Sequence, residues 1–159
     1  IERVPWETLY DGIPRFLHGD LQFDNILFDK ATDNFILLDW REDFGGSLEF
    51  GDIYYDYAKL NGGILLNYDY IKANLLQFEE NGDEIFFDFA QRRNSNVYEK
   101  ILHNFIRKNG HELNKVRLLV PLIYLNMSPL HHYPFDKILH ALGRQMLDLV
   151  LKTQDTNFR

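Results

Sequence analysis

The spacing of apolar residues changes near Gly51, and this change constrains the fold more than any other feature of the sequence. Before Gly51, apolar residues come in short runs that are separated by turn-forming segments. After Gly51, they recur at the three- and four-residue spacing of amphipathic helices. The sequence therefore predicts an α+β chain, with a small β-hairpin and its loops first and a mostly helical body behind them.

The front of the chain is predicted to contain a strand, a loop and a hairpin. The strand covers residues 15–18, and the two arms of the hairpin cover residues 25–28 and 35–38. Residues 29–34 lie between the arms and are rich in turn formers.

The first part of the body is predicted to hold two helices. Asp52 is expected to cap a helix that runs to about Asn61 and ends at Gly62–Gly63. A second helix is expected over residues 69–80, and the aromatic segment 84–89 fits either a strand or a helix.

The last third of the chain is helical by spacing. Three helices are expected: one from Val97 to Asn109, one over residues 113–127, and one from Phe135 to Val150. Pro121 should kink or split the second of these helices. Residues 153–159 are expected to form a frayed tail.

Charge and composition exclude several classes of protein. The 17 basic and 24 acidic residues give a net charge of −7, which argues against nucleic acid as a partner. The chain has no cysteine, so disulfides, thiolate metal sites and a cysteine nucleophile are excluded. No apolar run approaches the eighteen residues of a membrane span. We therefore expect a cytoplasmic protein that binds neither nucleic acid nor a membrane.

The polar residues His18, Asp20 and Asn25 are spaced as H-x-D-x-x-x-x-N, between the predicted strand and the hairpin. A loop of this length can fold back so that Asp20 and Asn25 face one cleft. Asp20 could then accept or orient a substrate hydroxyl, and the Asn25 amide oxygen could bind Mg²⁺, which prefers oxygen ligands. The same spacing occurs in the catalytic loop of protein kinases.

A second carboxylate for the metal has two candidates. Asp39 directly follows the arm over residues 35–38, whereas Asp43 begins the triplet Asp43-Phe44-Gly45, whose letters match a protein-kinase motif. A carboxylate at the end of a buried strand is held opposite the start of the other arm, and one in a glycine-rich turn is not. We therefore predict Asp39 as the metal ligand and interpret Asp43 as a turn residue.

Three motifs together resemble the aminoglycoside phosphotransferase and choline kinase superfamily. The motifs are His18-Gly19-Asp20-Leu21 with Asn25-Ile26-Leu27, then Leu38-Asp39-Trp40, then Gly51-Asp52-Ile53-Tyr54-Tyr55-Asp56-Tyr57-Ala58. Members of this superfamily are small-molecule kinases with a protein-kinase-like fold. The specific resemblance covers about residues 15–60, and the helical remainder is similar only in general character.

The resemblance implies a role for each matching residue. Asp20 would be the catalytic base, and Asn25 and Asp39 would bind the Mg²⁺ ions that bridge the phosphates of ATP. His18, Asp52 and Asp56 would support the catalytic loop. The implied reaction moves the γ-phosphoryl group of ATP to an alcohol group of a small molecule. The acceptor would be a sugar or sugar-like metabolite, choline or another amino alcohol, or an aminoglycoside.

The resemblance also implies that residues 1–159 form a single C-terminal kinase-like lobe. Within it, residues 1–14 are an irregular lead-in, 15–45 hold the catalytic loop and hairpin, and 46–153 form a helical subdomain. No glycine-rich phosphate loop and no strand lysine occur, and the first residue is Ile1 instead of methionine. We therefore expect the nucleotide-binding N-terminal lobe to lie elsewhere in a parent polypeptide, and this chain alone to be incomplete or inactive.

Three other interpretations remain open from the sequence. The chain could be a non-catalytic, pseudokinase-like module for binding or scaffolding, although the intact Asp20, Asn25 and Asp39 argue against it. Several tyrosines between residues 54 and 70 could form an aromatic cage for a quaternary ammonium group. His131 and His132 with Asp136 could imitate a metal site.

Overall fold

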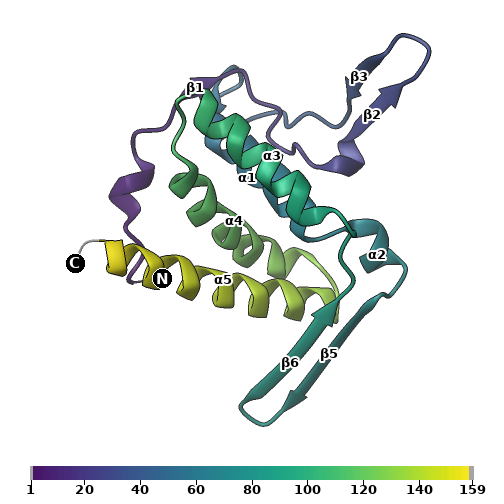
Figure 1. The fold of residues 1–159 in the computed structure, drawn as a ribbon, viewed down its shortest axis with the longest axis vertical. Coiled ribbons are helices and arrows are strands. Elements are labelled where there is room, and N and C mark those ends of the chain that lie inside the picture. Colours follow the sequence, from purple (N-terminus) through teal and green to yellow (C-terminus); the bar gives the residue numbers. More distant parts are fainter. Residues whose placement is uncertain (1, 158–159) are drawn as a thin grey trace.

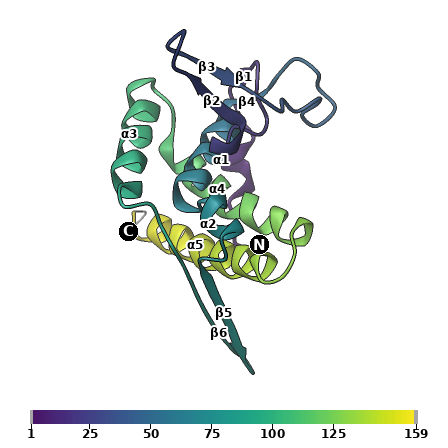
Figure 2. The same ribbon diagram turned by 90° about the vertical axis from the view of Figure 1, so that its right-hand side faces the viewer.

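The computed structural model describes residues 2–157, which fold as an α+β chain (Figure 1). A body of packed helices lies in the middle, and two β-hairpins project from it at opposite ends (Figures 1 and 2). The first part of the chain carries one hairpin, and the middle of the chain carries the other.

The elements follow one another in this order: η1 Trp6–Leu9, β1 Pro14–Arg15, η2 Phe23–Asn25, β2 Ile26–Asp29, β3 Asn34–Leu37, β4 Gly51–Asp52, α1 Ile53–Leu65, α2 Tyr68–Lys72, β5 Leu76–Asn81, β6 Glu84–Phe89, α3 Ser95–Lys108, α4 Leu113–Met127, η3 Ser128–Leu130 and α5 Phe135–Asn157. Here η marks a short 3₁₀ helix. In the described part of the chain the strands form three antiparallel pairs, β1 with β4, β2 with β3, and β5 with β6.

The predicted front hairpin is confirmed, but the strand before it is not. In the hairpin, Ile26 lies opposite Leu37 and Asp29 lies opposite Asn34. The strand expected over 15–18 is reduced to Pro14–Arg15, which pairs with β4. The backbone N–H groups of His18 and Gly19 donate to a carboxylate of α1 instead of to a neighbouring strand.

The glycine pair does not end α1, so that prediction is wrong. Asp52 caps the helix as expected, but the helix continues to Leu65. A side chain at Gly62 would meet the ring of Tyr124 at 3.2 Å, and the Tyr124 hydroxyl donates to the Gly62 carbonyl at 2.8 Å. The glycine therefore permits close packing between α1 and α4, where local propensity alone predicts a helix end.

The helix expected over residues 69–80 is also wrong. The structure has the short α2 and then β5, and Asn74 adopts a left-handed φ of 57° between them. Residues 84–89, whose sequence fitted either a strand or a helix, form the strand β6. Phe78 lies opposite Phe87, so most of the apolar residues of the two strands form one face of a hairpin, and Phe86 lies on the other face opposite Glu79. The predicted helical subdomain over 46–153 thus contains a hairpin.

The three helices expected in the last third of the chain are confirmed as α3, α4 and α5. Pro121 is buried inside α4 and does not split it. The Pro121 carbonyl lies 3.0 Å from where a side chain at Gly143 would begin, so α4 and α5 approach closely there. The helix α5 continues through most of the predicted tail to Asn157, and residues 158–159 lie outside the described residues.

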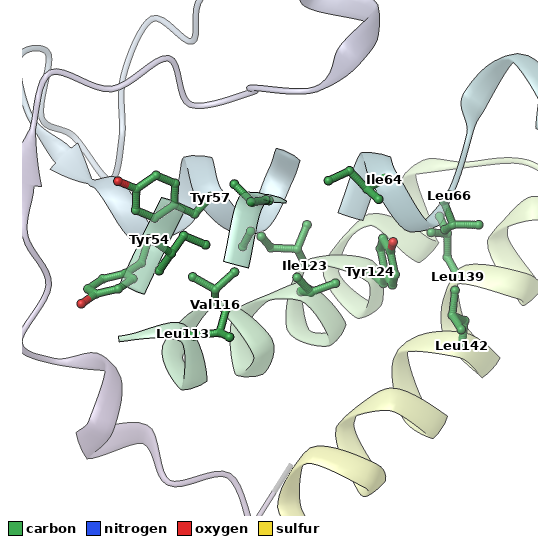
Figure 3. Packing of buried hydrophobic residues seen from close by; sticks show 14 of the residues in the cluster. Tyr54, Tyr57, Ile64, Leu66, Leu113, Val116, Ile123, Tyr124, Leu139 and Leu142 are labelled. Atoms are coloured by element: carbon green, nitrogen blue, oxygen red, sulfur yellow. The ribbon is translucent and has the colours of Figure 1, made fainter. Parts of the chain in front are cut away.

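The main core lies where α1, α3, α4 and α5 meet (Figure 3). Its best-buried side chains include Tyr54, Ile106, Val116 and Leu139. Burial of these side chains fixes α1 between α4 and the first hairpin with its loops (Figure 1). No helix in residues 2–157 combines the length and the apolar character that crossing a membrane requires.

His103 is expected to make the stability of this core depend on pH. The imidazole of His103 is buried in α3, and its Nε2 lies 2.9 Å from Asn61 Oδ1 of α1. Burial lowers the pKa of His103, with smaller contributions from nearby arginines, whereas Glu99 acts in the opposite direction. Below about pH 6.5 the unfolded chain therefore binds more protons at this position than the folded chain does.

We expect the free energy of unfolding to fall as the pH is lowered from 7 to 5. Urea unfolding followed by circular dichroism at each pH measures this loss. In His103→Gln the loss should be smaller, although part of it remains because burial also lowers the pKa of His131. An identical pH dependence in the variant and the wild type would contradict the prediction.

Candidate active site

The carboxylate of Asp56 anchors the loop that carries Asp20. Asp56 Oδ2 accepts a hydrogen bond from the His18 N–H, and Asp56 Oδ1 accepts one from the Gly19 N–H, both at 2.9 Å. Burial raises the pKa of Asp56, and the two N–H donors act in the opposite direction. Asp56 therefore fixes the backbone of the loop directly before Asp20.

Asp52 holds the start of the same segment. Its Oδ1 accepts hydrogen bonds from the N–H groups of Tyr54 and Ile13, each at 3.1 Å, so it caps α1 and ties down the chain before β1. Asp52 and Asp56 are one helical turn apart and lie on the same face of the chain entering α1. Asp56 therefore holds the loop itself, whereas Asp52 holds the start of α1 and the chain before β1.

Lys59 continues this face of α1 and contacts Asp20 directly. The Lys59 ammonium is buried, and its Nζ lies 2.5 Å from Asp20 Oδ1 and 3.8 Å from Met127 Sδ. One turn further along, a side chain at Gly63 would meet the Phe23 ring at 3.2 Å, so the loop lies close against α1 there as well. We call residues 52, 56, 59 and 63 the loop-facing stripe of α1.

Sequence reasoning missed Lys59. The available signal was its place three residues after Asp56, on a helix face that already carried two polar residues. A lysine at that position is expected to be exposed to solvent, because lysine is rarely buried without a partner. Its partner, Asp20, is distant in the sequence and becomes a neighbour only after folding.

The second oxygen of Asp20 is held by two amides. Asp20 Oδ2 accepts hydrogen bonds from Gln22 Nε2 and Asn25 Nδ2, both at 3.2 Å. Asn25 Nδ2 also donates to the backbone carbonyl of Asp20 at 2.9 Å. Because both acceptors require the NH₂ side of the Asn25 amide, its Oδ1 points to the other side and is the atom suited to a cation.

Asp39 stands beside Asn25, at the end of the neighbouring strand. The Leu38 N–H donates to the Asn25 carbonyl at 2.9 Å, and Asp39 follows with a left-handed φ of 56°. By contrast, Asp43 Oδ1 accepts from the Gly46 N–H at 3.1 Å and so closes an exposed turn. The structure therefore brings together Asp20 and Asn25, with Asp39 next to them in the fold, and leaves Asp43 in a turn.

The donor chemistry of Asn25 and Asp39 fits Mg²⁺. An amide oxygen and a carboxylate are the hard ligands that this ion takes, and it completes its shell with water and phosphate oxygens. Within residues 2–157, no group of three or more His, Cys, Asp or Glu side chains gathers to hold a metal. His131, His132 and Asp136 therefore do not form such a group either. The protein could supply only part of a coordination shell, which is the usual arrangement where Mg²⁺ arrives with a nucleotide.

His18 and Gly19 shape the loop from within. His18 is buried, its Nδ1 accepts from the Asp20 N–H at 3.2 Å, and its ring lies 4.8 Å from the Trp40 ring. Its Nε2 is buried and has no hydrogen-bond partner among the described residues. Gly19 has a φ of 80°, and a side chain there would meet Arg41 Cβ at 2.6 Å. The loop therefore requires glycine at this position.

Aromatic side chains pack together at the start of α2. Tyr68, at the start of α2, packs against the rings of His131 and Phe135 at 6.3 and 5.6 Å. Burial raises the pKa of Tyr68, and the carboxylates of Asp20 and Asp24 raise it further. Burial also lowers the pKa of His131, and the charge of Lys59 adds to that effect. The charge of Asp20 therefore acts on Tyr68, and the charge of Lys59 acts on His131.

The tyrosines do not form the aromatic cage that the sequence left open. Tyr54 and Tyr57 are buried in the core, where their rings pack against each other and against His111. Tyr55 packs against the edge of that core and against Phe44, and Tyr68 lies beyond the other end of α1, where it packs against Phe135. Rings that point to separate places cannot enclose one ammonium group.

An apolar cavity of about 510 Å³ lies on another side of the loop, between it and the helices α1 and α3. Leu21, Phe23, Leu60 and Phe105 are among the residues that line it, and Asp20 is not. The cavity therefore does not contain the carboxylate on which the predicted chemistry depends.

Comparisons with known proteins identify no relative: no family model, no curated protein and no solved structure matches the chain.

Proposed function

We propose that this chain is the C-terminal lobe of an ATP- and Mg²⁺-dependent small-molecule kinase of the aminoglycoside phosphotransferase and choline kinase type. The main support for the proposal is the way in which the carboxylate of Asp20 is held. Asp20 is held on both carboxylate oxygens, by Lys59 on one and by Gln22 and Asn25 on the other. A loop residue fixed in this way, beside an amide oxygen and a carboxylate suited to Mg²⁺, meets the requirement of phosphoryl transfer for positioned groups.

In this reaction Asp20 orients the acceptor hydroxyl and takes its proton as the oxygen attacks the γ-phosphorus of ATP. The bond from that phosphorus to the oxygen bridging to the β-phosphate breaks, and ADP leaves. General base catalysis contributes about 10²- to 10⁴-fold, and positioning contributes much of the rest. Asn25 and Asp39 would hold Mg²⁺, which neutralises negative charge on the phosphate oxygens.

The first hairpin supports the proposal of a nucleotide-binding lobe in the parent polypeptide. β2 and β3 expose large apolar side chains far from the core; they are Leu27, Phe28, Phe35 and Ile36, between 47% and 70% exposed. Leu27 and Ile36 lie on one face of the hairpin and Phe28 and Phe35 on the other, and exposed apolar side chains gathered on one element in this way mark a protein interface. It lies on the hairpin that carries Asn25 and Asp39 at its base, which is where a lobe covering ATP would have to sit.

A screen of alcohols for ATP consumption tests the proposed function. The full-length polypeptide is incubated with Mg·ATP and sugars, polyols, amino alcohols or aminoglycosides, and ADP and the phosphorylated product are both measured. Acceptor-dependent product formation is expected. If ATP binds but no acceptor is phosphorylated, the chain is better described as a pseudokinase-like binding or scaffolding module.

Replacing Asp39 with alanine should weaken Mg²⁺-dependent binding of ATP by about 10- to 100-fold, because it removes a carboxylate that would hold the metal. Titration calorimetry of the full-length polypeptide with and without Mg²⁺ measures this effect. Asp43→Ala is the matched control, since Asp43 only closes an exposed turn. Unchanged affinity in Asp39→Ala, or a loss in Asp43→Ala instead, would place the metal elsewhere.

A further inference from the structure

Three carboxylates on the loop and on α2 are paired with cations. Asp20 pairs with Lys59 at 2.5 Å, and Asp24 pairs with Lys72 at 3.1 Å. On α2, Asp69 lies 3.9 Å from Arg92. An overall charge of −7 would suit a cationic acceptor, but three of the carboxylates in this region each have a cation beside them.

Lys59 differs from the other two cations because it is buried. Its side chain is 8% exposed, whereas those of Lys72 and Arg92 are 68% and 37% exposed. Water and salt screen an exposed charge, but a buried charge acts over several ångströms at a lower effective dielectric constant. The field of Lys59 therefore reaches a molecule bound at Asp20, whereas that of Lys72 is largely screened.

The side chains near Lys59 add little that would favour a cationic ligand. Met127 carries no charge, burial raises the pKa of Tyr68, and burial together with the charge of Lys59 lowers the pKa of His131, so none of the three supplies a negative charge. The aromatic rings do not form a cage for an ammonium group, because Tyr54 and Tyr57 are buried in the core. Tyr68 and His131 do offer ring faces and polar atoms, which suit a ligand with both C–H surfaces and hydroxyl groups.

We propose that Lys59 is a specificity-determining residue, which makes this site select uncharged polyhydroxyl acceptors over acceptors that carry an ammonium group. The inference rests on the proposed function and narrows its acceptor to one chemical class. An ammonium group bound at Asp20 would lie near the Lys59 cation and would have to compete with it for the same carboxylate. A neutral hydroxyl has no such repulsion and can share Asp20 with Lys59.

Matched pairs of acceptors test the proposal in the full-length polypeptide. Each pair contains an uncharged alcohol and its amino counterpart, such as glucose and glucosamine, and kcat/KM is measured for both. The wild type should prefer the uncharged member. Lys59→Met keeps the length of the side chain and removes its charge, and it should shift the ratio toward the amine by about 10- to 100-fold. Because the effect is expressed as a ratio of two kcat/KM values, any loss of turnover that is the same for both acceptors cancels.

Lys72→Met is the matched control, because it removes an exposed lysine that is also paired with a carboxylate of the loop. It should change the ratio by less than about threefold, since exposed ion pairs are weak. Lys59→Gln serves as the second uncharged variant if Lys59→Met unfolds. A wild-type preference for the amine, or a ratio that neither Lys59 variant changes, would overturn the proposal.

Binding separates the failure of this inference from failure of the proposed function. The same pairs are titrated calorimetrically into the polypeptide saturated with a non-hydrolysable ATP analogue. If the binding preference and its dependence on Lys59 are observed without phosphoryl transfer, the specificity stands and the kinase activity is wrong. If transfer occurs with equal preference for both members of each pair, the kinase activity stands and the inference is wrong.

Discussion

Replacing Asp20 with asparagine is expected to abolish phosphoryl transfer and also to lower the free energy of unfolding. The variant loses the base that accepts the hydroxyl proton. It also leaves Lys59 buried without an anionic partner, which costs about 2–4 kcal/mol. Steady-state turnover measures the first effect, and urea unfolding measures the second. From the sequence alone, a charged residue in a loop would be expected to be replaceable without loss of stability.

The double variant Asp20→Asn with Lys59→Met separates the two effects. Removing both charges restores the free energy of unfolding to within about 1 kcal/mol of the wild type, because methionine can pack beside Met127 without burying a charge. Turnover stays absent, because the base is still missing. A stable Asp20→Asn protein would show that the ion pair is not buried in solution. Turnover by the double variant would exclude Asp20 as the base.

The second large effect is expected from Asp56→Ala. The variant removes the acceptors of the His18 and Gly19 N–H groups, which are both buried. Leaving two such donors without partners costs about 2–5 kcal/mol in total. The loop also loses its anchor, and displacement of Asp20 by about 1 Å should reduce kcat by about 100-fold.

The matched control for Asp56→Ala is Asp148→Ala on α5, where an exposed carboxylate pairs with Lys152. It should change the free energy of unfolding by less than about 1 kcal/mol and leave turnover unaltered. Wild-type turnover in Asp56→Ala would show that the loop is held by other contacts. Chemical denaturation of both variants, together with their kcat values, measures the difference.

Features with a local cause could be predicted from the sequence. The hairpin of β2 and β3 follows from two apolar runs around a turn-rich segment, and the cap at Asp52 follows from a polar residue before a helical pattern. The spacing of Asp20 and Asn25 correctly indicated that a single loop would bring them together. Each of these signals lies within a few residues of the structure that it predicts.

Features with a distant cause could not be predicted. Gly62 stays helical because Tyr124 of α4 packs against it, and residues 76–81 form a strand because residues 84–89 pair with them. Lys59 is buried because Asp20 meets it only in the folded chain. In all three cases a contact from another element outweighs the local preference, which is worth only a fraction of a kcal/mol per residue.

The loop-facing stripe of α1 also limits which insertions, deletions and substitutions the sequence of this helix can accept during evolution. Its contacts come from a single helix, and each residue added to a helix rotates everything after it by about 100°. An insertion or deletion between Asp56 and Lys59 would turn Lys59 away from Asp20 and Gly63 away from Phe23 at once. Outward-facing positions of α1 can therefore accept new side chains over evolution, while the number of residues between Asp52 and Gly63 must stay constant.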